Sequence, residues 1–192
     1  MKRTAIFGGS FNPIHKGHLG IAKAIIDADA TDELWLMVSP QNPLKHQNDL
    51  LPENCRLQMA KAAVKDMERV EASDFEFHLP RPSYTWNTMN ELELAYPECQ
   101  FSLVIGADNW YVFHKWAHHI ELLEKYPLII YPREGYPIDT KTLPKSAILI
   151  DAPLFPWSSS QIREALKKGD IVNNMLSPET LLIIRANQYY AE

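Results

Sequence analysis

The stretch "RTAIFGGSFNPIHKGHL" (residues 3–19) contains the transition that decides the fold. Its first part, "RTAIF", is a short apolar run typical of a strand. Gly8 and Gly9 end this run, because glycine allows backbone dihedrals and close approaches that other residues resist. An amphipathic helical pattern begins around Lys16. We therefore predict a strand, a glycine turn and a helix start, whose backbone N–H groups favour an anion.

The rest of the chain alternates between strand-like and helical patterns. Apolar runs predict further strands at residues 34–38, 101–105, 127–131 and 147–150, with a weaker candidate near 69–77. Strands that are apolar throughout are buried on both faces, and the intervening helices supply the cover. The sequence thus predicts an α/β fold: a doubly wound, mostly parallel sheet with helices on both faces, which binds ligands at the carboxyl ends of its strands. We expect residues 1–192 to form a single domain, since two halves would each have a thin core.

The charge balance excludes some classes of partner. The chain has 19 Lys plus Arg against 24 Asp plus Glu, a net charge of −5, so no global basic field attracts nucleic acid or anionic lipid. A phosphate site must therefore be built locally. The chain shows neither the apolar region of a signal peptide nor a membrane-spanning run, and we expect a cytoplasmic protein without a membrane partner. Cys55 and Cys99 form no Cys-x-x-Cys pair, and the sequence leaves homo-oligomerisation open.

His15 and His18 are the distinguishing feature of the opening stretch. They stand three residues apart at a helix start and could face one pocket, with Gly17 leaving room for a ligand to approach the backbone. On spacing alone, a surface or packing pair, a metal site and a phosphate site all remain open. A metal site is the weakest of these, because further ligands are not evident. The phosphate interpretation fits better, since Nε2–H donors beside a helix N-terminus can follow charge on a phosphoryl oxygen.

A second candidate phosphate site lies in "WSSSQIREALKKGD" (157–170). Ser158 and Gln161 form a capping box, so the helix begins at Ser159. Ser159 and Arg163 stand four residues apart and share a helix face. Hydroxyl groups, N–H groups and a guanidinium at a helix start suit a polyphosphate, although a well-capped surface helix with an exposed arginine is the plainer alternative.

Both segments resemble motifs of one known family. Gly8 to Leu19 resembles the HxGH signature of the nucleotidyltransferase superfamily, and above all that of the bacterial nicotinate mononucleotide adenylyltransferases. "SSSQIR" resembles the ISSTxIR motif, which in these enzymes holds the β- and γ-phosphates of ATP, with Trp157 in place of an aliphatic residue and Ser160 in place of threonine. The resemblance runs from Ile6 to about Tyr190. It implies a Rossmann-like nucleotidyltransferase fold and transfer of the adenylyl group of ATP to nicotinate mononucleotide in NAD biosynthesis.

The expected mechanism is direct in-line attack of the acceptor phosphate on the ATP α-phosphate. An ionised phosphate is already a nucleophile, so neither a general base nor a covalent intermediate is required. We expect His18 at the α-phosphate, His15 at a neighbouring phosphate and Arg163 at the leaving pyrophosphate. Phosphate charge should favour the imidazolium form of the histidines. Mg²⁺ is expected on the phosphate oxygens of ATP, without a dedicated metal site in the protein.

The resemblance also implies binding residues for both substrates. ATP contacts are expected at Gly8, Gly9, Ser10, Phe11, Gly106, Asp108, Arg133, Ser158, Ser159 and Ser160. Contacts with the acceptor are expected at Asn12, Lys45, Tyr84, Thr85 and Trp116. In the family, a tryptophan positioned like Trp116 stacks on the pyridine ring, and helix-start N–H groups near Thr85 suit a nicotinate carboxylate.

Plainer interpretations of some of these residues stay open. Ser83 or Thr85 could be a simple helix cap, Asp108 could be an N-cap, and Trp116 could be a core aromatic. Other acceptors, such as nicotinamide mononucleotide or phosphopantetheine, are alternatives within the superfamily. A non-catalytic nucleotide sensor is an alternative from another class, although a sensor has no need of both histidines and the arginine.

Overall fold

The computed structural model describes residues 1–40 and 50–191. Within them, six strands form one sheet in the order β3-β2-β1-β4-β5-β6, and every neighbouring pair is parallel. The strands are β1 (Lys2–Gly9), β2 (Glu33–Val38), β3 (Val70–Ser73), β4 (Cys99–Gly106), β5 (Leu128–Tyr131) and β6 (Ala147–Leu149). The predicted parallel α/β sheet is confirmed, including the weaker strand candidate near 69–77.

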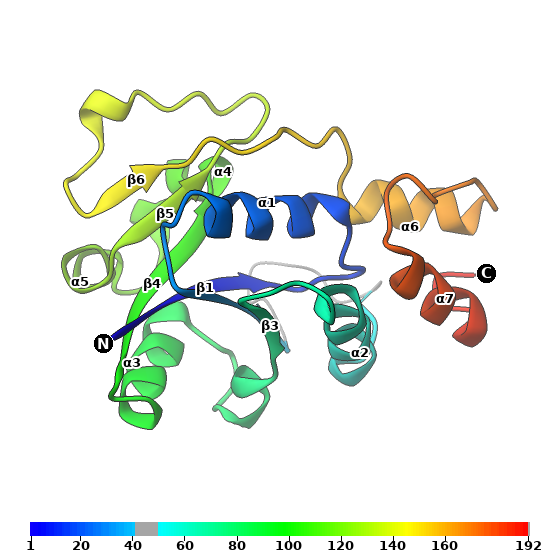
Figure 1. Cartoon of the computed structure of the whole chain (residues 1–192), viewed down its shortest axis with the longest axis horizontal. Coiled ribbons are helices and arrows are strands. Elements are labelled where there is room, and N and C mark those ends of the chain that lie inside the picture. Colours follow the sequence, from blue (N-terminus) through cyan, green and yellow to red (C-terminus); the bar gives the residue numbers. More distant parts are fainter. Residues whose placement is uncertain (41–49, 192) are drawn as a thin grey trace.

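Helices cover both faces of the sheet, as predicted (Figure 1). The α-helices are α1 (Lys16–Asp27), α2 (Glu53–Val64), α3 (Thr85–Ala95), α4 (Ala107–Tyr111), α5 (His119–Lys125), α6 (Ser159–Lys167) and α7 (Pro178–Asn187). Short 3-10 helices are η1 (Phe75–His78), η2 (Phe113–Lys115) and η3 (Thr140–Thr142). One core contains residues of α1, α2, α6 and α7, and the other contains residues of α3 and α5. None of the described helices is long and apolar enough to cross a membrane.

The central strand β1 shows why apolar and polar residues do not alternate in the apolar runs. Ala5 and Phe7 point into the core beneath α1, whereas Ile6 points into the core beneath α3. All three side chains are at most 3% exposed. Because successive residues of a strand face opposite sides, a strand covered on both faces must be apolar at every position.

The order of the strands fixes where a ligand can bind. The chain moves from β1 to β2 and β3 on one side, then returns to place β4 on the other side of β1. The loops that leave β1 and β4 therefore diverge from one point at the carboxyl edge. Such a switch point is where doubly wound sheets bind nucleotides.

Candidate active site

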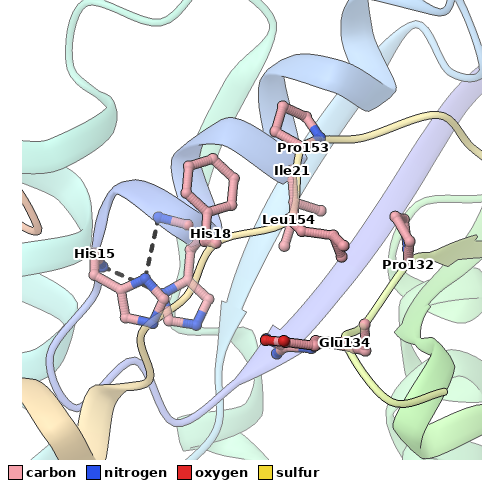
Figure 2. A pocket seen from close by; sticks show the side chains of 10 residues that line it. His15, His18, Ile21, Pro132, Glu134, Pro153 and Leu154 are labelled. Atoms are coloured by element: carbon pink, nitrogen blue, oxygen red, sulfur yellow. Dashed lines mark hydrogen bonds between the residues drawn. The ribbon is translucent and has the colours of Figure 1, made fainter.

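The loop between β1 and α1 brings the rings of His15 and His18 together at the start of α1. His15 is the N-cap of α1, and its Nδ1 accepts a hydrogen bond from the Gly17 N–H at 3.1 Å. The Nδ1 of His18 accepts one from the His15 N–H at 3.2 Å (Figure 2). The two rings lie 3.8 Å apart between centroids. In a neutral imidazole whose Nδ1 accepts, the proton is on Nε2, so both rings present Nε2–H donors.

The position of Gly17 requires a glycine because of His15. A Cβ at this position would lie 2.8 Å from Cε1 of His15 and 3.3 Å from Cβ of Phe155. The space that a side chain would occupy is thus filled by the ring of His15. This close approach brings the His15 ring over the first turn of α1.

The charge state of His15 is set by its surroundings. The residue is 5% exposed, and burial lowers its pKa to about 4, with the cationic Arg133 acting in the same direction. In the absence of nucleotide, His15 is thus neutral at pH 7. Phosphate oxygens beside the ring would shift the pKa upward, since an opposite charge favours the protonated form. The expected imidazolium at His15 therefore depends on the phosphates themselves.

The capping box predicted for α6 is present. Ser158 is the N-cap, and its Oγ accepts from the Gln161 N–H at 3.3 Å, while its own N–H donates to Gln161 Oε1 at 2.7 Å. The helix begins at Ser159, as predicted. Reciprocal bonds of this kind fix the first turn and leave the remaining helix-start N–H groups facing outward.

The two predicted phosphate segments contact each other directly. Nη1 of Arg163 donates to the Asn12 carbonyl at 2.9 Å, and its Nη2 donates to Oγ of Ser160 at 3.3 Å. Oγ of Ser159 donates to the Pro13 carbonyl at 3.0 Å. The start of α6 is therefore docked on the loop that leads into His15. Segments about 150 residues apart in the chain become neighbours at the carboxyl edge of β1.

A small pocket connects the histidine pair to the end of β5. Figure 2 shows its lining side chains, with His15 and His18 on one side and Pro132 and Glu134 on the other. The described residues that line it are His15, Gly17, His18, Ile21, Pro132, Arg133, Glu134, Pro153, Leu154 and Phe155. Of the predicted ATP contacts outside the histidine loop, Arg133 is the one that reaches this pocket.

The end of β4 carries a second group of predicted ATP contacts. Oδ1 of Asp108 lies 3.6 Å from Nε of Arg133, and Nη2 of Arg133 donates to the Tyr131 hydroxyl at 3.2 Å. A Cβ at Gly106 would lie 2.3 Å from Asp108 Oδ1, so the carboxylate needs glycine at that position. Gly106, not Asp108, is the N-cap of α4, which corrects the plainer interpretation of Asp108.

The glycines and Phe11 of the opening loop face different surroundings. A Cβ at Gly8 would meet no atom within 4 Å, so the space beside it is open. A Cβ at Gly9 would lie 2.9 Å from the ring of Phe11, which is itself 2% exposed. The Phe11 ring lies 5.0 Å from that of His18, edge to face. The Phe11 ring thus packs against that of His18, and because it is buried it is not accessible to a nucleotide.

The predicted acceptor residues lie apart from this pocket. Thr85 is the first residue of α3, and the N-cap is Tyr84, which makes no side-chain cap bond. The interpretation of Ser83 or Thr85 as the helix cap is therefore wrong. Trp116 ends η2, half-buried, with its ring 5.3 Å from that of Phe113. None of Tyr84, Thr85 and Trp116 is among the described residues that line the small pocket.

Aromatic stacking nevertheless joins the segments that carry these acceptor residues. Trp86, next to Thr85, stacks on His118 with the ring centroids 5.4 Å apart. His118 lies two residues after Trp116, so the start of α3 is adjacent to the segment that follows η2. Lys45, the remaining acceptor residue besides Asn12, lies outside the described residues.

Comparison with known proteins gives the family. A family model described as cytidylyltransferase-like matches residues 6–165. A nicotinate-nucleotide adenylyltransferase of Bacteroides fragilis is 46% identical over 176 residues, which cover 92% of this chain and 88% of the relative. The chain belongs to the nicotinate-nucleotide adenylyltransferase family. It is thus a nucleotidyltransferase of NAD biosynthesis, as the sequence motifs predict.

Further members of the nicotinate-nucleotide adenylyltransferase family match nearly the whole chain. That of Flavobacterium johnsoniae is 38% identical and covers 98% of both chains. Among solved structures, Plasmodium falciparum nicotinic acid mononucleotide adenylyltransferase complexed with NaAD superposes with a TM-score of 0.82. It is 22% identical and covers 99% of this chain and 98% of its own, so this likeness shows a shared fold.

Sequence reasoning missed Arg56, which is fully buried in this nicotinate-nucleotide adenylyltransferase family member. Its guanidinium donates to carbonyl oxygens at 2.6–3.0 Å, namely those of Ser10, Ser39, Pro40 and Leu51. These oxygens lie in the loops that follow β1 and β2 and in the segment before α2. A signal was present in the sequence, because Arg56 stands on the same apolar stripe as Ala60 and Val64, where an arginine needs partners.

Sequence reasoning also missed the partner of Asn12 in this family member. Asn12 is 5% exposed, and its Oδ1 accepts from the Tyr190 hydroxyl at 2.7 Å and from the Leu51 N–H at 3.3 Å. Its predicted contact with the acceptor must therefore coexist with an oxygen that already has two donors. Nothing in the local pattern around Asn12 indicates that a tyrosine near the C-terminus completes this arrangement.

Proposed function

We propose that residues 1–192 act as one cytoplasmic nucleotidyltransferase domain that transfers the adenylyl group of ATP to nicotinate mononucleotide, with nicotinate adenine dinucleotide and pyrophosphate as products. The observation that carries the proposal is the docking of α6 on the loop before His15, through Arg163 and Ser159. A triphosphate along this loop would meet imidazole donors at one end and a guanidinium at the other. The names of the curated relatives and the NaAD complex of the Plasmodium enzyme support the choice of substrates.

The reaction in this proposal is a direct displacement. An oxygen of the mononucleotide phosphate attacks the α-phosphorus of ATP, and the bond from that phosphorus to the bridging oxygen of pyrophosphate breaks. The Nε2–H of His18 donates to the α-phosphate as charge shifts across it, and that of His15 donates to a neighbouring phosphate. Arg163 neutralises the leaving pyrophosphate. No protein group gains or loses a covalent bond, in keeping with phosphoryl transfer by positioning and charge stabilisation.

The surroundings of several loop residues support the remaining proposed ATP contacts. The open space beside Gly8 allows close approach of a phosphate to the backbone, and the hydroxyls of Ser158, Ser159 and Ser160 lie at the start of α6. Gly9, Ser10 and Phe11 contribute through their main chain, because the Phe11 ring is buried. Gly106, Asp108 and Arg133 surround the adenosine at the end of β4.

The acceptor contacts use the second group of residues. The ring of Trp116 stacks on the pyridine, and the N–H groups at the start of α3, near Tyr84 and Thr85, receive the nicotinate carboxylate. Lys45 is the proposed basic contact of the acceptor phosphate. Asn12 is a further proposed contact of the acceptor, and its Oδ1 also accepts hydrogen bonds from Tyr190 and from the Leu51 N–H.

Magnesium fits this proposal as a companion of ATP. The groups that converge here are imidazole N–H, hydroxyl and guanidinium donors, which bind phosphate oxygens rather than a hard cation. Mg²⁺ would be held by the phosphate oxygens and water and would neutralise part of their charge. His15, His18 and Arg163 then bind the phosphate oxygens that the ion leaves uncovered.

Pyrophosphate release tests the proposal. The purified protein is incubated with Mg-ATP and, separately, with nicotinate mononucleotide, nicotinamide mononucleotide or phosphopantetheine. We expect fast release with the nicotinate form and much slower release with the others. Failure to release pyrophosphate with nicotinate mononucleotide would reject the proposal, and equal rates with the amide would change it to dual specificity. Tight ATP binding without release for any acceptor would favour a nucleotide sensor.

A further inference from the structure

A tyrosine at the end of the chain contacts the loop that carries the catalytic histidines. Tyr190 follows α7 and is 9% exposed, and its hydroxyl donates to Oδ1 of Asn12 at 2.7 Å. The two residues are 178 positions apart in the chain. Both side chains are buried, so this hydrogen bond lies in the interior of the protein.

Asn12 connects this bond to the groups proposed to hold ATP. Its carbonyl oxygen is the acceptor for Arg163 at 2.9 Å, and the next carbonyl, of Pro13, is the acceptor for Ser159 at 3.0 Å. His15, the N-cap of α1, comes two residues later. A displacement of Asn12 would therefore move the anchor points of Arg163 and Ser159 together and would alter the approach to His15.

We propose that Tyr190 is a positioning residue for adenylyl transfer: its hydroxyl fixes the Asn12 side chain and, through it, the carbonyl oxygens that hold Arg163 and Ser159. This inference rests on the proposed function. Tyr190 touches neither substrate in this proposal. It acts through the loop, and its effect should be greatest on the part of the reaction that uses ATP.

The surroundings of Tyr190 suit such a role. Burial raises the pKa of its hydroxyl, so the group stays protonated and remains a hydrogen-bond donor at neutral pH. The helix before it is already anchored by Leu181 and Ile184, which belong to the same core as Ala5 and Phe7. Attachment of the C-terminal segment thus does not depend on the hydroxyl, and removal of one oxygen should affect the loop more than the fold.

Tyr190→Phe tests this inference, with Tyr189→Phe as a matched control. The neighbouring Tyr189 is half-buried, and its hydroxyl pairs with Cys55 in α2 rather than with the histidine loop. We expect kcat/KM for ATP to fall about tenfold in Tyr190→Phe, less than the roughly 100-fold that a misplacement of about 1 Å can cause. The control should stay within about twofold of wild type, the variation expected of a substitution away from the site.

Three readouts separate positioning from a purely structural role. Thermal unfolding is followed for each variant, and kinetics are measured well below every melting temperature, so that all protein is folded. Tyr190→Phe is also combined with Arg163→Ala, where positioning through the loop predicts a smaller additional loss than in the wild-type background, because one of the groups being positioned is gone. An unchanged kcat/KM in Tyr190→Phe, or losses that simply multiply in the double variant, would overturn the inference. Wild-type protein without activity would instead overturn the proposed function.

Discussion

The parts of the site that we propose to bind ATP and the acceptor differ in how their side chains are held. On the ATP side, hydrogen bonds from α6 and from the C-terminal segment converge on Asn12 and Pro13. On the acceptor side, Tyr84, Thr85 and Trp116 lie at helix ends, and an aromatic stack between Trp86 and His118 joins their segments. The ATP side is thus preorganised by bonds to the main chain, whereas the acceptor side depends on individual exposed or half-buried side chains. Changes on the first should affect turnover, and changes on the second should affect the KM of the acceptor.

The largest expected effect comes from His18→Ala. Loss of a donor to the α-phosphate should lower kcat by about 10³-fold while the fold is kept, a magnitude typical of removing a preorganised donor. Steady-state kinetics with saturating ATP and nicotinate mononucleotide measure it, and circular dichroism checks the fold. The exposed His78 provides a matched control, His78→Ala, that should retain wild-type turnover. Wild-type kcat in His18→Ala would remove His18 from the mechanism.

Arg163→Ala should affect ATP more than the acceptor. A hydrogen bond to a charged group contributes roughly 1.5–3 kcal/mol, so kcat/KM for ATP should fall by about 10- to 100-fold. The KM of nicotinate mononucleotide should change little, which would sharpen the division between the two sides. Arg185→Ala, at an exposed arginine of α7, is the control. Equal losses for both substrates would show that the two sides are not separate.

The buried state of His15 predicts a dependence of stability on pH. Its pKa is about 4 in the folded protein, and near 6.5 in the unfolded chain. The unfolded state therefore binds more protons between these values, so the stability contribution of neutral His15 is complete above about pH 6.5 and is lost as the pH falls toward 4.

Urea unfolding of wild type and His15→Asn between pH 4 and pH 7 measures this dependence. Over that range, the free energy of unfolding should rise by roughly 2–3 kcal/mol more in wild type than in the variant. Because both proteins share every other titrating group, the difference isolates His15. Parallel pH profiles would indicate that His15 is not held neutral by burial.

The smallest expected effect is on the acceptor side. Trp116→Ala should raise the KM of nicotinate mononucleotide about 5- to 10-fold, the size of a lost aromatic stack on a base, with kcat and the KM of ATP nearly unchanged. Trp116→Phe keeps a ring and should recover most of the affinity. If both variants bind the acceptor like wild type, the pyridine stacks elsewhere.

Local patterns in the sequence predicted the fold and the starts of α1 and α6 well. The middle of β1, Ala5 to Phe7, is continuously apolar because both its faces are covered, and the capping box of Ser158 and Gln161 needs only residues three apart. The turn before the histidines follows from such short-range signals, whereas the strand order was not predicted. The helix cap of α3 did not, because the serine and threonine on either side of Tyr84 were equally suitable by composition.

Long-range hydrogen bonds could not be predicted. Arg56 holds the loop after β1 through a main-chain carbonyl oxygen 46 positions away, and such an oxygen leaves no trace in the residue type that carries it. Tyr190 holds the same loop through the side chain of Asn12, 178 positions away, and no local pattern joins the two residues. The orientation of the Phe11 ring could not be predicted from the sequence either. Its φ of +46° turns the ring beneath Gly9. A motif match alone would place that ring beside the nucleotide.

The carbonyl oxygens that surround Arg56 affect how ATP binding should respond to ionic strength. Its positive charge is fully buried, and within residues 1–40 and 50–191 no carboxylate forms an ion pair with it. A buried charge is screened by salt far less than an exposed one. Because Arg56 contacts the Ser10 carbonyl in the loop proposed to bind phosphate, part of the attraction for a polyphosphate should persist at high salt. An acidic protein can in this way keep its affinity for ATP in concentrated electrolyte, where a site made of exposed lysines would lose it.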